Sequence, residues 1–170
     1  MRLLLFQLYH PAFAQSLPPS VGVAPQAGYA SVTIAPQVSK TNGPSAVNAS
    51  IATVRGTIKS SWVRASNDGA DPFELKVTVP VGSHAVVRVP LHLGEGSLAT
   101  VRLVEVSEGI ELFGGSVASN SSSATRGADK ISWLLAAARL VGGSAEGDGE
   151  GLAAIEIETA AGEFHFQLFP

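Results

Sequence analysis

Apolar and polar residues alternate along most of this chain, the pattern of a half-buried β-strand. The clearest stretch is PFELKVTVP, residues 72–80, with four apolar residues on one face, three polar residues on the other and a closing proline. YASVTIAP, residues 29–36, shows a shorter version that Pro36 ends, because proline cannot donate to a sheet ladder. The run SIATVRGTIKSSWV, residues 50–63, predicts a longer strand with Ile51, Ile58 and Trp62 facing inward.

Turn residues separate these runs. ASNDGAD, residues 65–71, tolerates positive φ and predicts a hairpin that joins the strand ending near Trp62 to the strand 72–80. Further strands are predicted in HAVVRVP (84–90) and ATVRLVEV (99–106), and AAIEIETAAGEFHFQLF (153–169) reads as a closing hairpin. About seven short strands predict an all-β chain, an antiparallel β-sandwich or jelly roll.

One segment, at about 114–151, breaks the alternation. Two Gly/Ser-rich stretches flank ADKISWLLAAARLV, residues 128–141, whose apolar residues cluster at helical spacing: Ile131, Leu134, Leu135, Ala138 and Leu140. We therefore predict one inserted amphipathic helix, with Asp129 and Arg139 placed as a helix dipole prefers. The segment could cap the open end of the sandwich, dock a partner or stay disordered.

The first 20 residues predict a leader that precedes a domain at 21–170. Arg2, an apolar stretch and Ala12-Phe13-Ala14 resemble a secretory signal cut before Gln15, although the stretch is interrupted by polar residues. The alternative is a remnant of a longer chain. The location is therefore extracellular if residues 1–14 are a signal and cytoplasmic otherwise. No run approaches the roughly 20 apolar residues of a transmembrane helix, so we predict no transmembrane segment.

Composition narrows the function. The 170 residues carry 11 basic and 14 acidic side chains, a net charge of −3, without the basic stripe that nucleic-acid binding requires. The chain has no cysteine, which removes disulfides and thiolate metal ligands. No two of the four histidines, His10, His84, His92 and His165, have the spacing of a metal site on one element. We predict no nucleic-acid partner, no metal site and no cofactor.

Acidic and aromatic residues are the remaining candidates for chemistry. Glu105, Glu108 and Glu111 are close in sequence, but alternation places them on the solvent face of a strand and its turn. Asp68 and Asp71 lie in a turn, where carboxylates commonly bind backbone N–H groups. We predict no catalytic residue. The only tryptophans, Trp62 and Trp133, are candidate carbohydrate-binding residues, with a core position as the alternative for each.

The order and spacing of several short motifs resemble the C-terminal β-sandwich domain of bacterial-type α-L-rhamnosidases. Gly28-Tyr29 is followed by a strand that ends in Pro36-Gln37, and the spacing G-x-I-x-x-x-W is carried by Gly56, Ile58 and Trp62. The pattern V-T-V-P-x-x-x-x-A-x-V-x-x-P, a hairpin in the family, spans residues 77–90, and a closing G-x-F-x-F spans 162–166. The resemblance covers roughly residues 22–113 and 152–170.

The resemblance implies a domain that supports catalysis without performing it. The family removes terminal α-L-rhamnose with inversion, and its carboxylates lie on a large α/α barrel that precedes this domain. No such barrel is present in this sequence, so the first hypothesis is a non-catalytic domain whose partner is that barrel. The alternatives are a stand-alone lectin-like module for rhamnosides or other carbohydrates, and a protein-interaction module that uses the inserted helix. A domain separated from its barrel is expected to expose an apolar patch, and therefore to self-associate or to be unstable.

Overall fold

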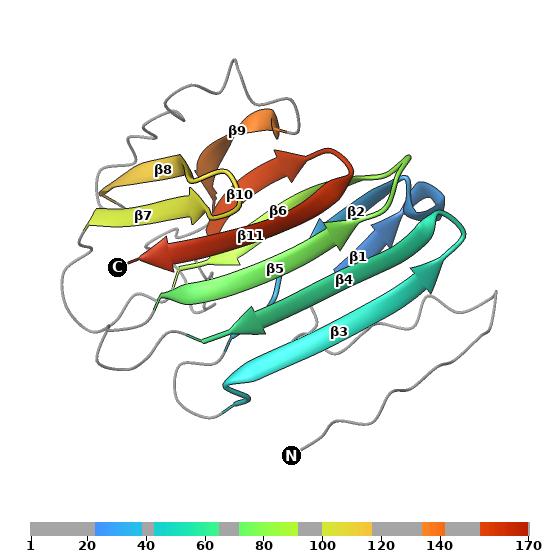
Figure 1. Cartoon of the computed structure of the whole chain (residues 1–170), viewed down its shortest axis with the longest axis horizontal. Helices are drawn as coiled ribbons and strands as arrows, with labels where there is room; N and C mark the ends of the chain where they lie inside the picture. Colours follow the sequence, from blue (N-terminus) through green and yellow to red (C-terminus); the bar gives the residue numbers. More distant parts are fainter. Residues whose placement is uncertain are drawn as a thin grey trace, which may run out of the picture.

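The chain folds into two stacked β-sheets, as the alternation predicts. The computed structural model describes residues 23–38, 43–64, 72–91, 100–116, 134–141 and 154–169. Figure 1 shows one sheet in front and the other behind it. The five-stranded sheet has the order β1 (Val23–Gln26), β2 (Ser31–Ile34), β6 (His84–Pro90), β10 (Ala154–Thr159), β9 (Leu134–Val141). The six-stranded sheet has the order β3 (Ala46–Thr53), β4 (Gly56–Val63), β5 (Phe73–Val79), β11 (Gly162–Phe169), β7 (Thr100–Glu105), β8 (Ile110–Ser116).

Among the strands that the structure describes, neighbours are antiparallel with one exception. The pair β2 and β6 is parallel, with Val32 opposite Ala85 and Ile34 opposite Val87. A short 3-10 turn, η1 (Ala27–Tyr29), joins β1 to β2. The all-β class and the two-sheet sandwich are therefore confirmed, with more and shorter strands than the sequence predicts.

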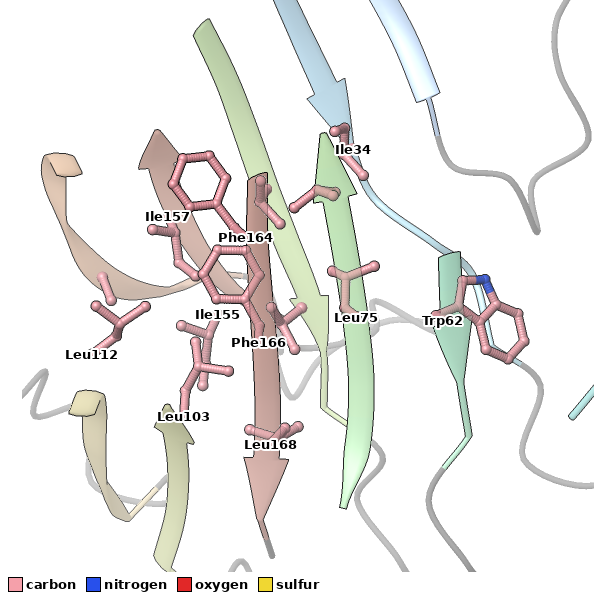
Figure 2. Close-up of a cluster of buried hydrophobic side chains, with 14 of the residues drawn as sticks. Ile34, Trp62, Leu75, Leu103, Leu112, Ile155, Ile157, Phe164, Phe166 and Leu168 are labelled. Atoms are coloured by element: carbon pink, nitrogen blue, oxygen red, sulfur yellow. The ribbon is translucent and has the colours of Figure 1, made fainter. Parts of the chain in front are cut away.

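The core lies between the sheets and is built from the inward residues of both. On β5 every second residue is buried, and the same period continues on β11 with Phe164, Phe166 and Leu168. Figure 2 shows these three side chains following one another along β11, with Ile155 and Ile157 of the opposite sheet in the same cluster. Burying a side chain of this size contributes about 1.5–3 kcal/mol, so the alternation supplies much of the stability of the fold.

The hairpin predicted around Trp62 is present. Strands β4 and β5 pair with Trp62 opposite Leu75, and the Trp62 and Phe73 ring centroids lie 6.3 Å apart. The run 50–63, however, forms two strands, because β3 and β4 turn back on each other at Val54-Arg55. Gly56, with φ 128°, allows this turn, since a Cβ there would lie 2.9 Å from Cβ of Pro80.

Two predicted hairpins, β10–β11 and β5–β6, are wrong, because their strands do not pair with each other. β10 and β11 are consecutive, but β10 lies in the five-stranded sheet and β11 in the six-stranded sheet. β5 and β6 are divided between the sheets in the same way, although the resemblance implied a hairpin there. In each case the turn crosses from one sheet to the other. The apolar faces of the two strands are then buried against each other across the core, which an in-sheet hairpin would not achieve.

The inserted helix is not present in the described residues, and its second half is a strand. Leu134–Val141 is β9, which pairs antiparallel with β10, with Arg139 opposite Glu156. The sequence LLAAARLV is apolar at almost every position, so it satisfies the helical period and the strand period alike. Pairing with the edge of β10 decides between them, and Ala138 is buried while Arg139 is exposed.

Some predictions fall outside the described residues. These are the leader at 1–20, most of the insertion at 114–151, and Trp133. Within 114–151 the structure describes the end of β8 and all of β9, so β8 extends two residues past the predicted start of the insertion. The domain boundaries remain predictions. Among the described residues no helix is both long and apolar enough to cross a membrane.

Candidate functional surfaces

Glu105, Glu108 and Glu111 lie at the β7–β8 turn. Glu105 is buried and Glu111 is exposed, so these two carboxylates do not face each other as an acid and a base would. Glu105 points inward and is only 1% exposed, which corrects the prediction that it lies on the solvent face. Its Oε2 accepts a hydrogen bond from the backbone N–H of Glu108 at 2.8 Å, and its Oε1 accepts one from the N–H of His165 at 3.2 Å. Glu111 lies on the outer face of β8 and is exposed. Glu105 therefore ties the turn to β11.

The two tryptophans offered as carbohydrate-binding residues have different outcomes. Trp62 is 1% exposed and packs in the core. A ring buried to that extent has no face on which a sugar could stack, so the core position, which the sequence left open, is the one that the structure gives to Trp62. Trp133 lies outside the described residues, and its role remains a prediction.

The described histidines do not gather into a metal site. His84 is at the exposed start of β6, while His165 is on the outer face of β11. The Nε2 atom of His165 lies 3.5 Å from Oε2 of Glu74. Within the part of the chain that the structure describes, no three His, Cys, Asp or Glu side chains are close enough to hold a metal ion.

A buried glutamate joins three strands on the outer face of the five-stranded sheet. Glu156 of β10 is 4% exposed and stands between Arg88 of β6 and Arg139 of β9. Nε of Arg88 donates to Oε2 at 2.8 Å, and Nε and Nη2 of Arg139 both donate to Oε1. Burial raises the pKa of Glu156, but the hydrogen bonds from Arg139 and Arg88 outweigh burial and lower it below 4.5.

Three turns meet at one end of the sandwich, and Arg55 links them. Its Nη1 donates to the carbonyl of Gly82 at 2.8 Å and its Nε to the carbonyl of Gly28 at 3.3 Å. Beside Gly28, Tyr29 has φ 63°, an uncommon backbone conformation for a bulky residue. The tips of the two outer turns are Val54 and Val81, which are 92% and 87% exposed. We call this end the turn surface.

A hollow of about 310 Å³ lies on the outer face of the six-stranded sheet, over β11, β7 and β8. Its side chains come from alternate, outward positions of these strands and from their connecting turn: Arg102, Val104, Val106, Glu111, Gln167 and Phe169. Arg102 lies over the ring of Phe169, with its Cζ 5.0 Å from the ring centroid. The hollow combines a cation, a carboxylate, an amide and an aromatic ring.

Sequence reasoning missed the Glu156 cluster and the hollow for one physical reason. Both depend on which strands are neighbours, and alternation predicts which way a residue points but not what lies beside it. Arg139 was assigned to a helix, so its contact with Glu156 had no signal in the sequence. Strands β7 and β11 are neighbours in the sheet, and their pairing places Arg102 opposite Phe169 although the two residues are far apart in the chain.

Comparison with known proteins gives one matching family. Residues 22–100 match the family described as the bacterial alpha-L-rhamnosidase C-terminal domain. No curated protein is similar enough in sequence to match the chain.

Two solved structures are similar to this chain, and one of them is similar enough to show the fold. The α-L-rhamnosidase from Dictyoglumus thermophilum has a TM-score of 0.53 and 17% identity over 89% of this chain and 12% of that chain. The Streptomyces avermitilis α-L-rhamnosidase, solved with L-rhamnose, has a TM-score of 0.46 and 18% identity over 89% of this chain and 10% of that chain. This chain thus spans only a small part of either enzyme, 12% of the Dictyoglumus chain and 10% of the Streptomyces chain. The resemblance predicted from the sequence is confirmed, because residues 22–100 match the C-terminal domain of bacterial α-L-rhamnosidases and the two-sheet fold agrees with that of a solved α-L-rhamnosidase.

Proposed function

We propose that this chain is the non-catalytic β-sandwich of an α-L-rhamnosidase-like glycoside hydrolase and supports a barrel domain that removes terminal α-L-rhamnose. The observation that carries the proposal is the match of residues 22–100 to the C-terminal domain of that family. The size relation supports it, since this chain corresponds to only 12% of the Dictyoglumus enzyme. The large remainder of such an enzyme can hold the acid and base, which inverting hydrolysis requires at roughly 6.5–9.5 Å from each other.

The turn surface is the contact that we propose for the barrel. Valine is β-branched and has no local reason to occupy the tip of a tight turn, yet Val54 and Val81 do so on two adjacent turns. Arg55 fixes one turn to the other through the Gly82 carbonyl, so both apolar tips are held in place before any partner binds. Contacts that are rigid in advance lose less conformational entropy on association.

Activity of the isolated chain tests the non-catalytic role. Purified 170-residue chain is incubated with p-nitrophenyl α-L-rhamnopyranoside, and the same sample is titrated with L-rhamnose in a calorimeter. We expect no turnover and no heat of binding. Turnover that persists after contaminating enzyme is removed would overturn the proposal. Binding of L-rhamnose without turnover would favour the lectin-like alternative.

The turn surface is tested in a chimera in which this chain replaces the matching region of the Dictyoglumus enzyme. Val54→Asp with Val81→Asp should lower the melting temperature of the chimera but leave the free chain unchanged, because both side chains are almost fully exposed there. Val63→Asp is the matched control, since Val63 is 50% exposed and lies at the far end of β4. An equal effect of the double variant and the control would refute this contact surface.

The alternative of a protein-interaction module relied on an inserted helix. Residues 134–141, the second half of that predicted helix, form strand β9 instead. The lectin-like alternative loses Trp62 as a sugar platform, because that ring is buried. A carbohydrate role would need other residues.

A further inference from the structure

The position of Glu111 in the outer-face hollow over β11, β7 and β8 depends on the register of the β7–β8 pair and on a glycine at 114. Arg102 faces Gly114 across the β7–β8 pair, and Val104 faces Glu111. The register shifts between Leu103 and Val104, which brings Glu111 and Gly114 to the same outer face. The carboxylate of Glu111 fills the space that a side chain at 114 would occupy. Any residue larger than glycine at 114 would displace that carboxylate.

The charges around the hollow are not used for strand pairing. In a sheet, opposite charges that stabilise the structure face each other directly across neighbouring strands. Here Arg102 faces Gly114 on β8 and stacks on the ring of Phe169, while Glu111 faces Val104 on β7. Neither charge therefore has an opposite charge directly across the β7–β8 pair. No ion pair joins Arg102 or Glu111 to any residue that the structure describes. The hollow therefore presents one available cation and one available carboxylate.

Gln167 adds an oriented amide. Its Nε2 donates to Oε1 of Glu74 at 2.8 Å, which fixes the side chain and leaves the amide oxygen as an acceptor. Val104, Val106 and the Phe169 ring supply the apolar part of the lining. The lining thus combines apolar surface with a small number of placed polar groups, and such polar groups orient a ligand in a small-molecule site.

We propose that this hollow binds a small anionic polyol of the sugar-acid class. The ligand's carboxylate pairs with the guanidinium of Arg102, which offers a planar pair of donors. Ligand hydroxyls donate to the Glu111 carboxylate and to the amide oxygen of Gln167. The apolar side of the sugar ring packs on Val104, Val106 and the edge of Phe169. A neutral sugar would leave the Arg102 charge unmatched, so the site distinguishes acidic from neutral sugars.

This site does not depend on the supporting role proposed above. A domain beside a catalytic barrel and a free-standing domain could each carry it. It lies on the outer face of the six-stranded sheet, whereas the turn surface is built from the η1, β3–β4 and β5–β6 turns at one end of the sandwich. The two proposals can therefore fail separately.

The test is a titration of the purified chain with sodium D-glucuronate and, in parallel, with D-glucose, followed by amide chemical shifts at pH 7. We expect glucuronate to shift the amides of β7, β8 and β11 and to bind at least about tenfold more tightly than glucose, in line with the worth of a charge-assisted hydrogen bond. Arg102→Gln should weaken glucuronate binding by about tenfold or more, and Arg102→Lys by less.

The matched control is Lys59→Gln, which removes an exposed cation from β4 of the same sheet and should change the affinity less than about twofold. Thermal unfolding confirms that each variant is folded. Glu111→Gln should weaken glucose binding, because it replaces one acceptor oxygen for hydroxyls by an NH₂ group, and should weaken glucuronate binding less, because it also removes a negative charge that repels the ligand's carboxylate. The proposal is overturned if glucuronate causes no shifts in this region. It is also overturned if both sugars bind equally, or if Arg102→Gln and Lys59→Gln have the same effect.

Discussion

Glu156 is a buried carboxylate that two arginines hold, and Glu156→Gln measures how much these contacts stabilise the fold. The substitution keeps the size of the side chain but removes its charge and places an NH₂ group where an oxygen now accepts from an arginine. Three donors converge on the carboxylate, one from Arg88 and two from Arg139. A hydrogen bond to a charged group contributes about 1.5–3 kcal/mol when buried.

The solvent exposure of Arg88 and Arg139 reduces the free energy that these hydrogen bonds contribute. Their side chains are 47% and 62% exposed, so water can replace part of what they lose, whereas the glutamate side chain is 5% exposed. We therefore expect Glu156→Gln to lower the free energy of unfolding by about 2 kcal/mol, closer to one charged hydrogen bond than to three. Urea denaturation at pH 7 measures the difference. Glu163→Gln, at an exposed position on β11, is the control and should change stability by less than about 0.5 kcal/mol.

The pH dependence gives an independent check. The pKa of Glu156 in the folded chain lies below its ordinary value of 4.5, because the arginine hydrogen bonds outweigh burial. A carboxyl group with a lowered folded-state pKa stabilises the fold fully above the unfolded pKa and loses that contribution as pH falls through the folded pKa. The difference between wild type and Glu156→Gln should thus be constant near neutrality and shrink below about pH 4. A Glu156→Gln variant as stable as wild type at pH 7, or a difference that grows on acidification, would refute the reasoning.

Three further predictions concern buried polar groups and strand pairing. Thr159→Val should stabilise the fold by about 1 kcal/mol in thermal or urea unfolding, because the Thr159 hydroxyl is fully buried and has no hydrogen-bond partner among the described residues; a destabilised variant would contradict this. Glu105→Gln should cost about 1–3 kcal/mol in the same assay, since an NH₂ group would face a backbone N–H that needs an acceptor; an unchanged midpoint would show that neither bond matters. Val141→Cys with Ala154→Cys should form a disulfide on mild oxidation, because the two residues are direct partners on β9 and β10 and the chain has no other cysteine; mass spectrometry that shows only free thiols would contradict the β9 assignment.

The sequence predicted the inward and outward faces well and the partners of each strand poorly. The period of two on β5 identifies its buried residues correctly, because alternation is a local property of an extended chain. The turn after β10 is just as short as a hairpin turn, yet it crosses between the sheets. Nothing within residues 153–169 reports this, since the preference arises from the apolar faces that the rest of the chain provides.

The segment LLAAARLV failed for a related reason. A run that is almost uniformly apolar has no strong period, and its structure is then decided by the available partner, here the free edge of β10. The buried Glu105 and Glu156 were likewise hidden. An acidic residue in an alternating strand reads as solvent-facing unless the groups that satisfy it are known, and these groups come from β11, β6 and β9.

The central claim, that this sandwich supports a separate catalytic domain, is tested most directly in the Dictyoglumus enzyme. Three proteins are compared: the intact enzyme, a deletion that lacks the region matched by this chain, and the chimera that carries this chain in its place. We predict that the deletion melts at a lower temperature and hydrolyses p-nitrophenyl α-L-rhamnopyranoside more slowly than the intact enzyme, and that the chimera recovers a measurable part of both properties. A deletion as stable and active as the intact enzyme, or a chimera no better than the deletion, would contradict the account.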